Sequence, residues 1–135
     1  MLLALALLAL AGRTLRVMPH FLSYFSEWVG DAEHGVRLTG DSNIDWGQDN
    51  RRLIDYLKEH GISFIYLHIR NPNKEELDHD GIAWRMIGET ELAQPESGTY
   101  ALSIEFHRDL DLINYFRRNA PIAKIGKTIY LFQVP

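Results

Sequence analysis

The chain of 135 residues contains no cysteine, which excludes a disulfide scaffold, a thiolate zinc site and a cysteine nucleophile. This absence leaves the redox compartment open, since cysteine-free chains occur on both sides of the membrane. A strong charge of one sign is also missing: the formal net charge is -4, and Lys and Arg are scattered along the sequence. Because a nucleic-acid-binding protein needs a clustered basic surface, we expect no nucleic-acid partner.

The sequence also lacks the common catalytic motifs. It has no nucleophile elbow and no recognisable triad, and its histidines are not spaced as metal ligands. Gly126-Lys127-Thr128 imitates the end of a P-loop, but Pro121 stands where the first glycine belongs. The sequence therefore predicts no catalytic residue, no cofactor and no metal site.

Two acid-x-acid pairs imitate a metal-binding pattern. Asp109 and Asp111 stand at a predicted helix start, which favours a capping role. Asp78 and Asp80 stand in a polar stretch before Gly81, where a solvated loop is the simpler interpretation.

Residues 1–11 form an apolar run of strong helix formers. The run is too short to cross a bilayer, which takes about 20 residues. A signal peptide fits poorly, because Arg13 and Arg16 follow the apolar run instead of preceding it. We interpret residues 1–18 as the truncated end of a transmembrane helix; a buried helix of a soluble protein is the alternative.

Residues 19–34 predict an amphipathic linker helix that begins at Pro19 and ends near Gly30. Its aromatic side chains, among them Tyr24 and Trp28, suit a bilayer interface and a protein core equally well.

Residues 35–135 have the length of one α/β domain, and the overall content of 46% hydrophobic and 24% charged residues is typical of a folded protein. Periodicity and turn signals predict alternating elements. The expected strands are 36–40, 62–69, 84–87, 99–106, 122–125 and 128–134, and the expected helices are 49–60, 74–77 and 110–118. This order predicts a three-layer α/β sandwich with a mostly parallel sheet and a C-terminal antiparallel hairpin, preceded by the hydrophobic helix.

The polar nonapeptide 41–49 lies between the first predicted strand and the first predicted helix. Ligands of open α/β sheets bind at such positions, beyond the carboxyl end of a strand. An indole beside amides and carboxylates suits a sugar ring, through stacking and hydrogen bonds to hydroxyls. Helix capping by Asp45 or Asp49 is the alternative for those two carboxylates. The predicted substrate-binding residues are Asp41, Asn43, Asp45, Trp46, Gln48 and Asp49.

Four segments carry a resemblance to a known family: PHFLSYF (19–25), the segment 35–49 that ends in DSNIDWGQD, TYALS (99–103) and PIAKIG (121–126). They resemble the C-terminal soluble region of bacterial multi-pass membrane glycosyltransferases, which are similar to aminoarabinose transferases and protein O-mannosyltransferases using polyprenyl-phosphate sugars. The resemblance implies a domain outside the cytoplasmic membrane, tethered by the end of the last membrane helix. It also implies that the catalytic acid belongs to the membrane-embedded part, so this chain alone should be inactive.

Two functions follow as expectations. The first is an accessory domain that binds or orients an acceptor, a glycan or a lipid-linked sugar, with the membrane and the rest of the parent enzyme as partners. The second is a purely structural or dimerising cap without a ligand of its own. Burial separates them: free carboxylates beside an open indole favour binding, and an internally hydrogen-bonded motif favours structure.

Overall fold

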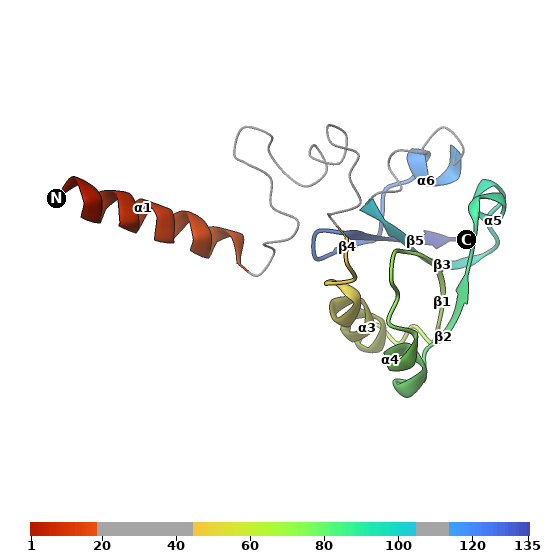
Figure 1. Ribbon diagram of the computed structural model, residues 1–135. Coiled ribbons are helices and arrows are strands. Elements are labelled where there is room, and N and C mark those ends of the chain that lie inside the picture. Colours follow the sequence, from red (N-terminus) through yellow and green to blue (C-terminus); the bar gives the residue numbers. More distant parts are fainter. Residues whose placement is uncertain (19–44, 105–113) are drawn as a thin grey trace.

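The computed structural model describes residues 1–18, 45–104 and 114–135 (Figure 1). The predicted linker helix 19–34, the predicted strand 36–40, and the residues Asp41 and Asn43 lie outside these ranges.

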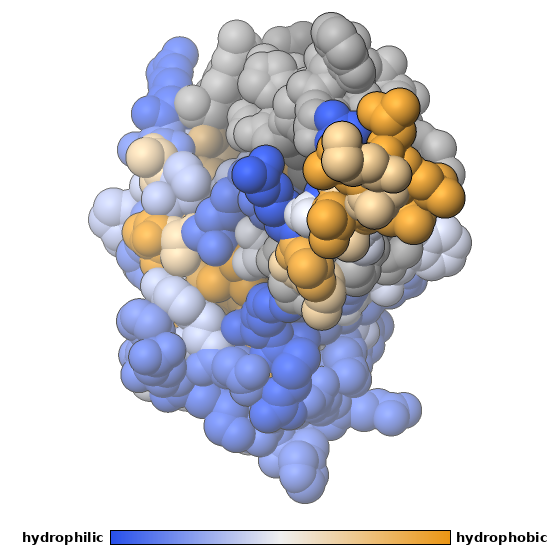
Figure 2. Space-filling view, turned by 90° about the vertical axis from the view of Figure 1, so that its left-hand side faces the viewer, coloured by the Kyte–Doolittle hydropathy of each residue, from blue (hydrophilic) through white to orange (hydrophobic). Residues whose placement is uncertain are grey.

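Helix α1 (Leu2–Val17) contains nearly all of the apolar N-terminal run. Its leucines are exposed, for example Leu2 at 85% and Leu8 at 70%. In Figure 2 this helix stands out in orange against a mostly hydrophilic surface. Among the described residues, no helix is both long enough and apolar enough to cross a membrane, and α1 itself has 16 residues.

Five strands form one mixed sheet in the order β2-β1-β3-β5-β4. The strands are β1 (Phe64–His68), β2 (Ala83–Met86), β3 (Gly98–Ser103), β4 (Ala123–Ile125) and β5 (Ile129–Val134). Strand β1 is parallel to β2 and β3, whereas β5 is antiparallel to β3 and β4.

The α/β class and the C-terminal hairpin are confirmed, and the described sheet is mixed: β1 forms parallel pairs with β2 and β3, and β5 forms antiparallel pairs with β3 and β4. The antiparallel pairs come from the tight turn after β4 (Ala123–Ile125). This turn makes β5 run antiparallel to β4, and β5 pairs with β3, so the hairpin forms an antiparallel edge of the sheet as predicted.

Besides α1, the described residues form four short helices: α3 (Asn50–Glu59), α4 (Lys74–His79), α5 (Glu89–Ala93) and α6 (Asn114–Arg118). Helix α3 confirms the predicted helix, α4 is longer than the predicted turn, and α6 covers the described part of the predicted helix 110–118. Helix α5 was not predicted.

The core lies on both faces of the sheet, because successive strand side chains point to opposite sides. On one face, Ile65 and Leu67 pack with Leu53 of α3 and Leu77 of α4. On the other face, the rings of strands β1, β3 and β5 pack with Leu92 of α5 and with Phe116 of α6; these rings belong to Tyr66, Tyr100, Tyr130 and Phe132. Figure 1 shows the two pairs of helices on different sides of the sheet.

Candidate functional site

The predicted site lies where the chain changes direction across the sheet. From β1 the chain passes through α4 to β2 on one side, and then through α5 to β3 on the other side of β1. The carboxyl ends of β1 and β3 therefore form a topological switch point, the usual ligand position in an open α/β sheet. Ser103 ends β3 at this point and contacts Asp45 of the nonapeptide.

Asp45 is buried, with 1% of its surface exposed. Its Oδ2 accepts a hydrogen bond from Ser103 Oγ at 2.7 Å, and its Oδ1 accepts one from the backbone N–H of Gly47 at 3.0 Å. The second bond closes a local turn, and Gly47 has the positive φ of 82° that such a turn favours in glycine. Asp45 thus joins the loop to the end of β3.

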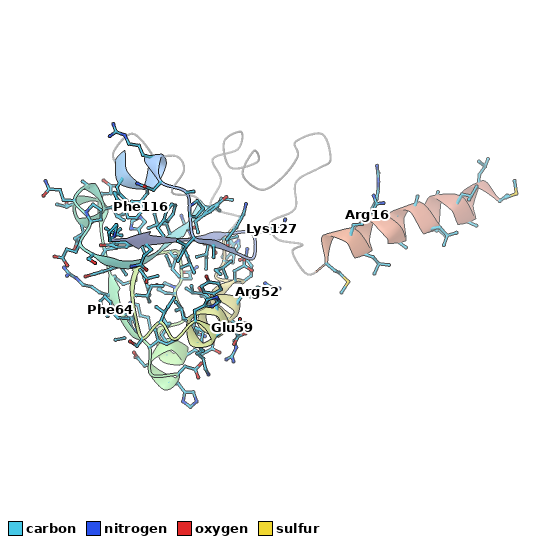
Figure 3. All side chains as sticks on the ribbon, turned by 180° about the vertical axis from the view of Figure 1, so that it is seen from behind. Arg16, Arg52, Glu59, Phe64, Phe116 and Lys127 are labelled. Atoms are coloured by element: carbon cyan, nitrogen blue, oxygen red, sulfur yellow. The ribbon has the colours of Figure 1, made fainter. Side chains whose placement is uncertain are left out.

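Asp49 is fully buried at 0% exposure and contacts the C-terminal hairpin. Its Oδ2 accepts from the backbone N–H of Lys127 at 2.8 Å, from the backbone N–H of Thr128 at 3.1 Å and from Thr128 Oγ1 at 2.9 Å. Its Oδ1 accepts from Arg52 Nη1 at 2.6 Å. Figure 3 shows Arg52 and Lys127 at the same end of the body. Asp49 therefore fastens the start of α3 to the turn between β4 and β5.

The capping interpretation is wrong for the Asp49 side chain. Asp49 occupies the N-cap position of α3, yet its carboxylate makes no capping hydrogen bond. The hairpin donors and Arg52 use the carboxylate instead, because a buried charge needs several charged or N–H partners at once.

The Gly126-Lys127-Thr128 segment, which imitates a P-loop, is the turn that receives Asp49. Gly126 has a φ of 58°, and a Cβ at this position would overlap the Asp49 carboxylate. The glycine therefore permits both the left-handed turn and the close approach of the carboxylate.

Trp46 and Gln48 lie between the two buried carboxylates. The indole is 60% exposed, and Gln48 Oε1 accepts from the backbone N–H of Trp46 at 2.7 Å. Of the predicted site residues that the structure describes, Asp45 and Asp49 face inward and Trp46 faces outward. Asp45, Trp46, Gln48 and Asp49 lie within one short loop. Because its two carboxylates are buried, this loop presents an exposed aromatic surface and not a pair of open carboxylates.

The sequence analysis missed the partners of this loop. Ser103 and Thr128 are the buried polar residues that receive the two carboxylates. Asn50 Nδ2 donates to the backbone carbonyl of Asn71 at 2.6 Å, which ties the start of α3 to the loop after β1. A signal was present for both: Ser103 follows the apolar Ala101 and Leu102 at the end of β3, and Thr128 directly precedes the apolar start of β5 at Ile129.

The Asp78 and Asp80 pair serves local contacts, and Asp78 lies within α4, not in a loop. Asp78 Oδ1 accepts from Trp84 Nε1 at 2.8 Å, and Asp80 Oδ1 accepts from Lys58 Nζ at 2.6 Å. The bond from Lys58 lowers the pKa of Asp80. Within residues 1–18, 45–104 and 114–135, no group of three or more His, Asp or Glu side chains could hold a metal ion. Asp109 and Asp111 lie outside the described residues.

The fold and the loop thus define a mixed α/β body whose switch point is closed by two buried carboxylates and carries an exposed indole. Comparison of the chain with protein-family models, curated proteins and solved structures finds no match.

Proposed function

We propose that the chain is an accessory domain of a membrane glycosyltransferase that takes its sugar from a lipid-linked donor. The sequence resemblance supports this family, and the exposed apolar α1 suits contact with a bilayer or with other membrane helices. Helices on both faces of the sheet support a three-layer sandwich. In this proposal, which for this point rests on the resemblance alone, the sandwich lies on the extracytoplasmic side and is tethered through the N-terminal segment. In this proposal the catalytic groups belong to the parent enzyme.

One observation carries the proposed role in glycan contact: an exposed indole stands on a loop fixed at both ends. Asp45 and Asp49 hold the loop to β3 and to the C-terminal hairpin, so Trp46 is presented at a defined place. A rigid aromatic side chain loses little conformational entropy on binding and offers an apolar face to a sugar ring. The two carboxylates then position the indole and do not touch the glycan.

The structural cap is the second candidate, and the burial of Asp45 and Asp49 favours it. Both carboxylates are satisfied within the domain, as expected if the nonapeptide only locks α3 to the sheet. In that case Trp46 would pack against the parent enzyme or against a second copy of the chain.

Tryptophan emission separates the two candidates. Replacing Trp28 and Trp84 with Phe leaves Trp46 as the sole indole, and this variant in non-ionic detergent is titrated with methyl glycosides of common hexoses and pentoses. Glycan contact predicts a saturable shift of the emission maximum. The matched control is the Trp46→Phe protein with Trp28 and Trp84 retained, which should not respond. An unchanged emission maximum with every glycoside would exclude the glycan role and leave the structural cap.

A further inference from the structure

A small hollow with polar side chains in its lining lies on the face of the sheet that α5 covers, away from the Asp49 contacts. In the strand register, Tyr66 of β1 stands opposite Arg85 of β2 on one side and opposite Tyr100 of β3 on the other. Three neighbouring strands therefore bring one guanidinium and two phenol rings into a single row. The loop between α5 and β3 closes the hollow with Glu96. We call this hollow the tyrosine notch.

The floor of the tyrosine notch is fixed by its own hydrogen bonds. The two tyrosine rings stack with centroids 4.6 Å apart. The Tyr66 hydroxyl donates to Glu96 Oε2 at 3.0 Å, and the Tyr100 hydroxyl donates to the backbone carbonyl of Glu96 at 2.8 Å. Both hydroxyls use their proton in these bonds, so each oxygen still has acceptor capacity toward the hollow. The bond to Glu96 also raises the pKa of Tyr66, which keeps its phenol protonated.

The rim of the tyrosine notch carries groups that a ligand could engage. Arg85 Nη2 lies 3.5 Å from Glu91 Oε1, at the outer limit of a hydrogen bond, and the two side chains are 53% and 44% exposed. An exposed pair at this distance contributes little to stability, so a ligand could reorganise it at small cost. Glu91 itself is held in place, because its other oxygen accepts from the backbone N–H of Gly88 at 2.8 Å. Gln94 adds an amide to the same rim.

We propose that the tyrosine notch binds a single small polyhydroxylated ring, such as one sugar residue. The hollow is shallow: its cavity volume is about 40 Å³, far below the roughly 300–1,000 Å³ of pockets for drug-sized ligands, so it would hold one edge of such a ring and leave the rest in solvent. Hydroxyl groups donate and accept, which matches the donors Arg85 and Gln94 and the acceptors Glu91 and Glu96. Two carboxylates against one guanidinium disfavour an anion. The notch shares no residue with the Trp46 loop, so it is a site beyond the proposed function.

The test is a titration of the ¹⁵N-labelled full chain, in non-ionic detergent, with the same panel of methyl glycosides and separately with inorganic phosphate. The proposal predicts saturable shifts of the Tyr100 amide and the Gln94 side-chain amide with at least one glycoside, and none with phosphate. Glu96→Gln and Arg85→Gln should each weaken that glycoside about tenfold or more, the effect of losing a charge-assisted hydrogen bond. Glu75→Gln removes an exposed carboxylate from α4 on the other face and should leave the affinity unchanged.

Each outcome decides the proposal. Silent notch signals with every glycoside, or shifts with phosphate alone, would overturn it. Shifts of the Trp46 signals without shifts of the notch signals would overturn the proposal that the tyrosine notch binds a sugar, and would leave the proposed glycan role of Trp46 in place. Shifts in the notch alone would support the notch and remove that role. Unchanged circular dichroism of both notch variants is the control for folding, because neither side chain belongs to the core.

Discussion

Replacing Asp49 with Ala should destabilise the domain far more than any exposed carboxylate of the same helix would. The substitution leaves the Thr128 N–H and the Thr128 hydroxyl buried without their acceptor, since Thr128 is 0% exposed. A buried donor that loses its partner costs about 1–3 kcal/mol. Lys127 N–H and Arg52 can turn to water, because the first is partly buried and the second is 40% exposed in its side chain.

Two orphaned donors give an expected loss of about 3–5 kcal/mol for Asp49→Ala. This is a large part of the about 5–15 kcal/mol that holds a domain together. Asp49→Asn keeps one acceptor oxygen for the hairpin donors and the side-chain shape, so it should cost about 1–2 kcal/mol, mostly from the lost hydrogen bond of Arg52, which would face the amide NH2 in place of Oδ1.

The assay is equilibrium urea unfolding of the full chain in non-ionic detergent, followed by circular dichroism. Asp55→Ala is the matched control on α3: its carboxylate is 58% exposed and pairs with Arg51 at 3.0 Å, so the loss should be about 0.5 kcal/mol or less. If the Asp49→Ala and Asp55→Ala proteins have the same free energy of unfolding, the hydrogen bonds of Asp49 do not stabilise the contact between α3 and the hairpin, and the reasoning is refuted.

Two further outcomes can be measured by the same method. Gly126→Ala should cost about 3 kcal/mol or more of unfolding free energy, because its Cβ would overlap the buried Asp49 carboxylate. The control is Gly61→Ala, which has a similar φ of 64° but open space around it, and which should cost only the roughly 1–2 kcal/mol of a left-handed residue. Equal losses would show that Gly126 does not approach the Asp49 carboxylate closely. The second outcome concerns pH. The Lys58 bond depresses the folded pKa of Asp80, so this contact stabilises the fold above the ordinary pKa of 3.8 and the stabilisation is lost as pH falls through the lower folded value. Lys58→Gln should therefore flatten the pH dependence of the urea midpoint below about pH 4, and an unchanged profile would contradict the assignment.

The elements with a strong local pattern could be predicted from the sequence. Helix α3 has three buried apolar residues, Leu53, Ile54 and Leu57, at helical spacing before Gly61, and β1 is a continuous run of apolar and aromatic residues. Helix α5 could not be predicted in the same way. It has five residues and a single buried anchor, Leu92, and it starts through a contact between Glu91 and the backbone of Gly88. One buried side chain does not establish a period.

The sequence could indicate where the candidate site lies, but it could not indicate which contacts its residues make. A polar loop before a helix in an α/β pattern indicates the carboxyl edge of the sheet, and Asp45 does lie beside the end of β3. The hairpin partners of Asp49, however, are 78 and 79 positions away in the sequence. No local pattern can show that Lys127 and Thr128 reach the start of α3. Only the insertion of β5 beside β3 brings that turn to Asp49.

The inward orientation of the two carboxylates also limits what the Trp46 loop can contribute to binding. A sugar at Trp46 would gain stacking of about 0.5–1.5 kcal/mol, but no open carboxylate from Asp45 or Asp49. A millimolar complex needs about 4 kcal/mol, so this contact holds a free glycoside only weakly, and the emission titration has to reach high glycoside concentrations to approach saturation. The contact can orient a glycan that the rest of a larger enzyme already holds, because the second contact is then intramolecular. An accessory role is therefore the one that this loop can fill.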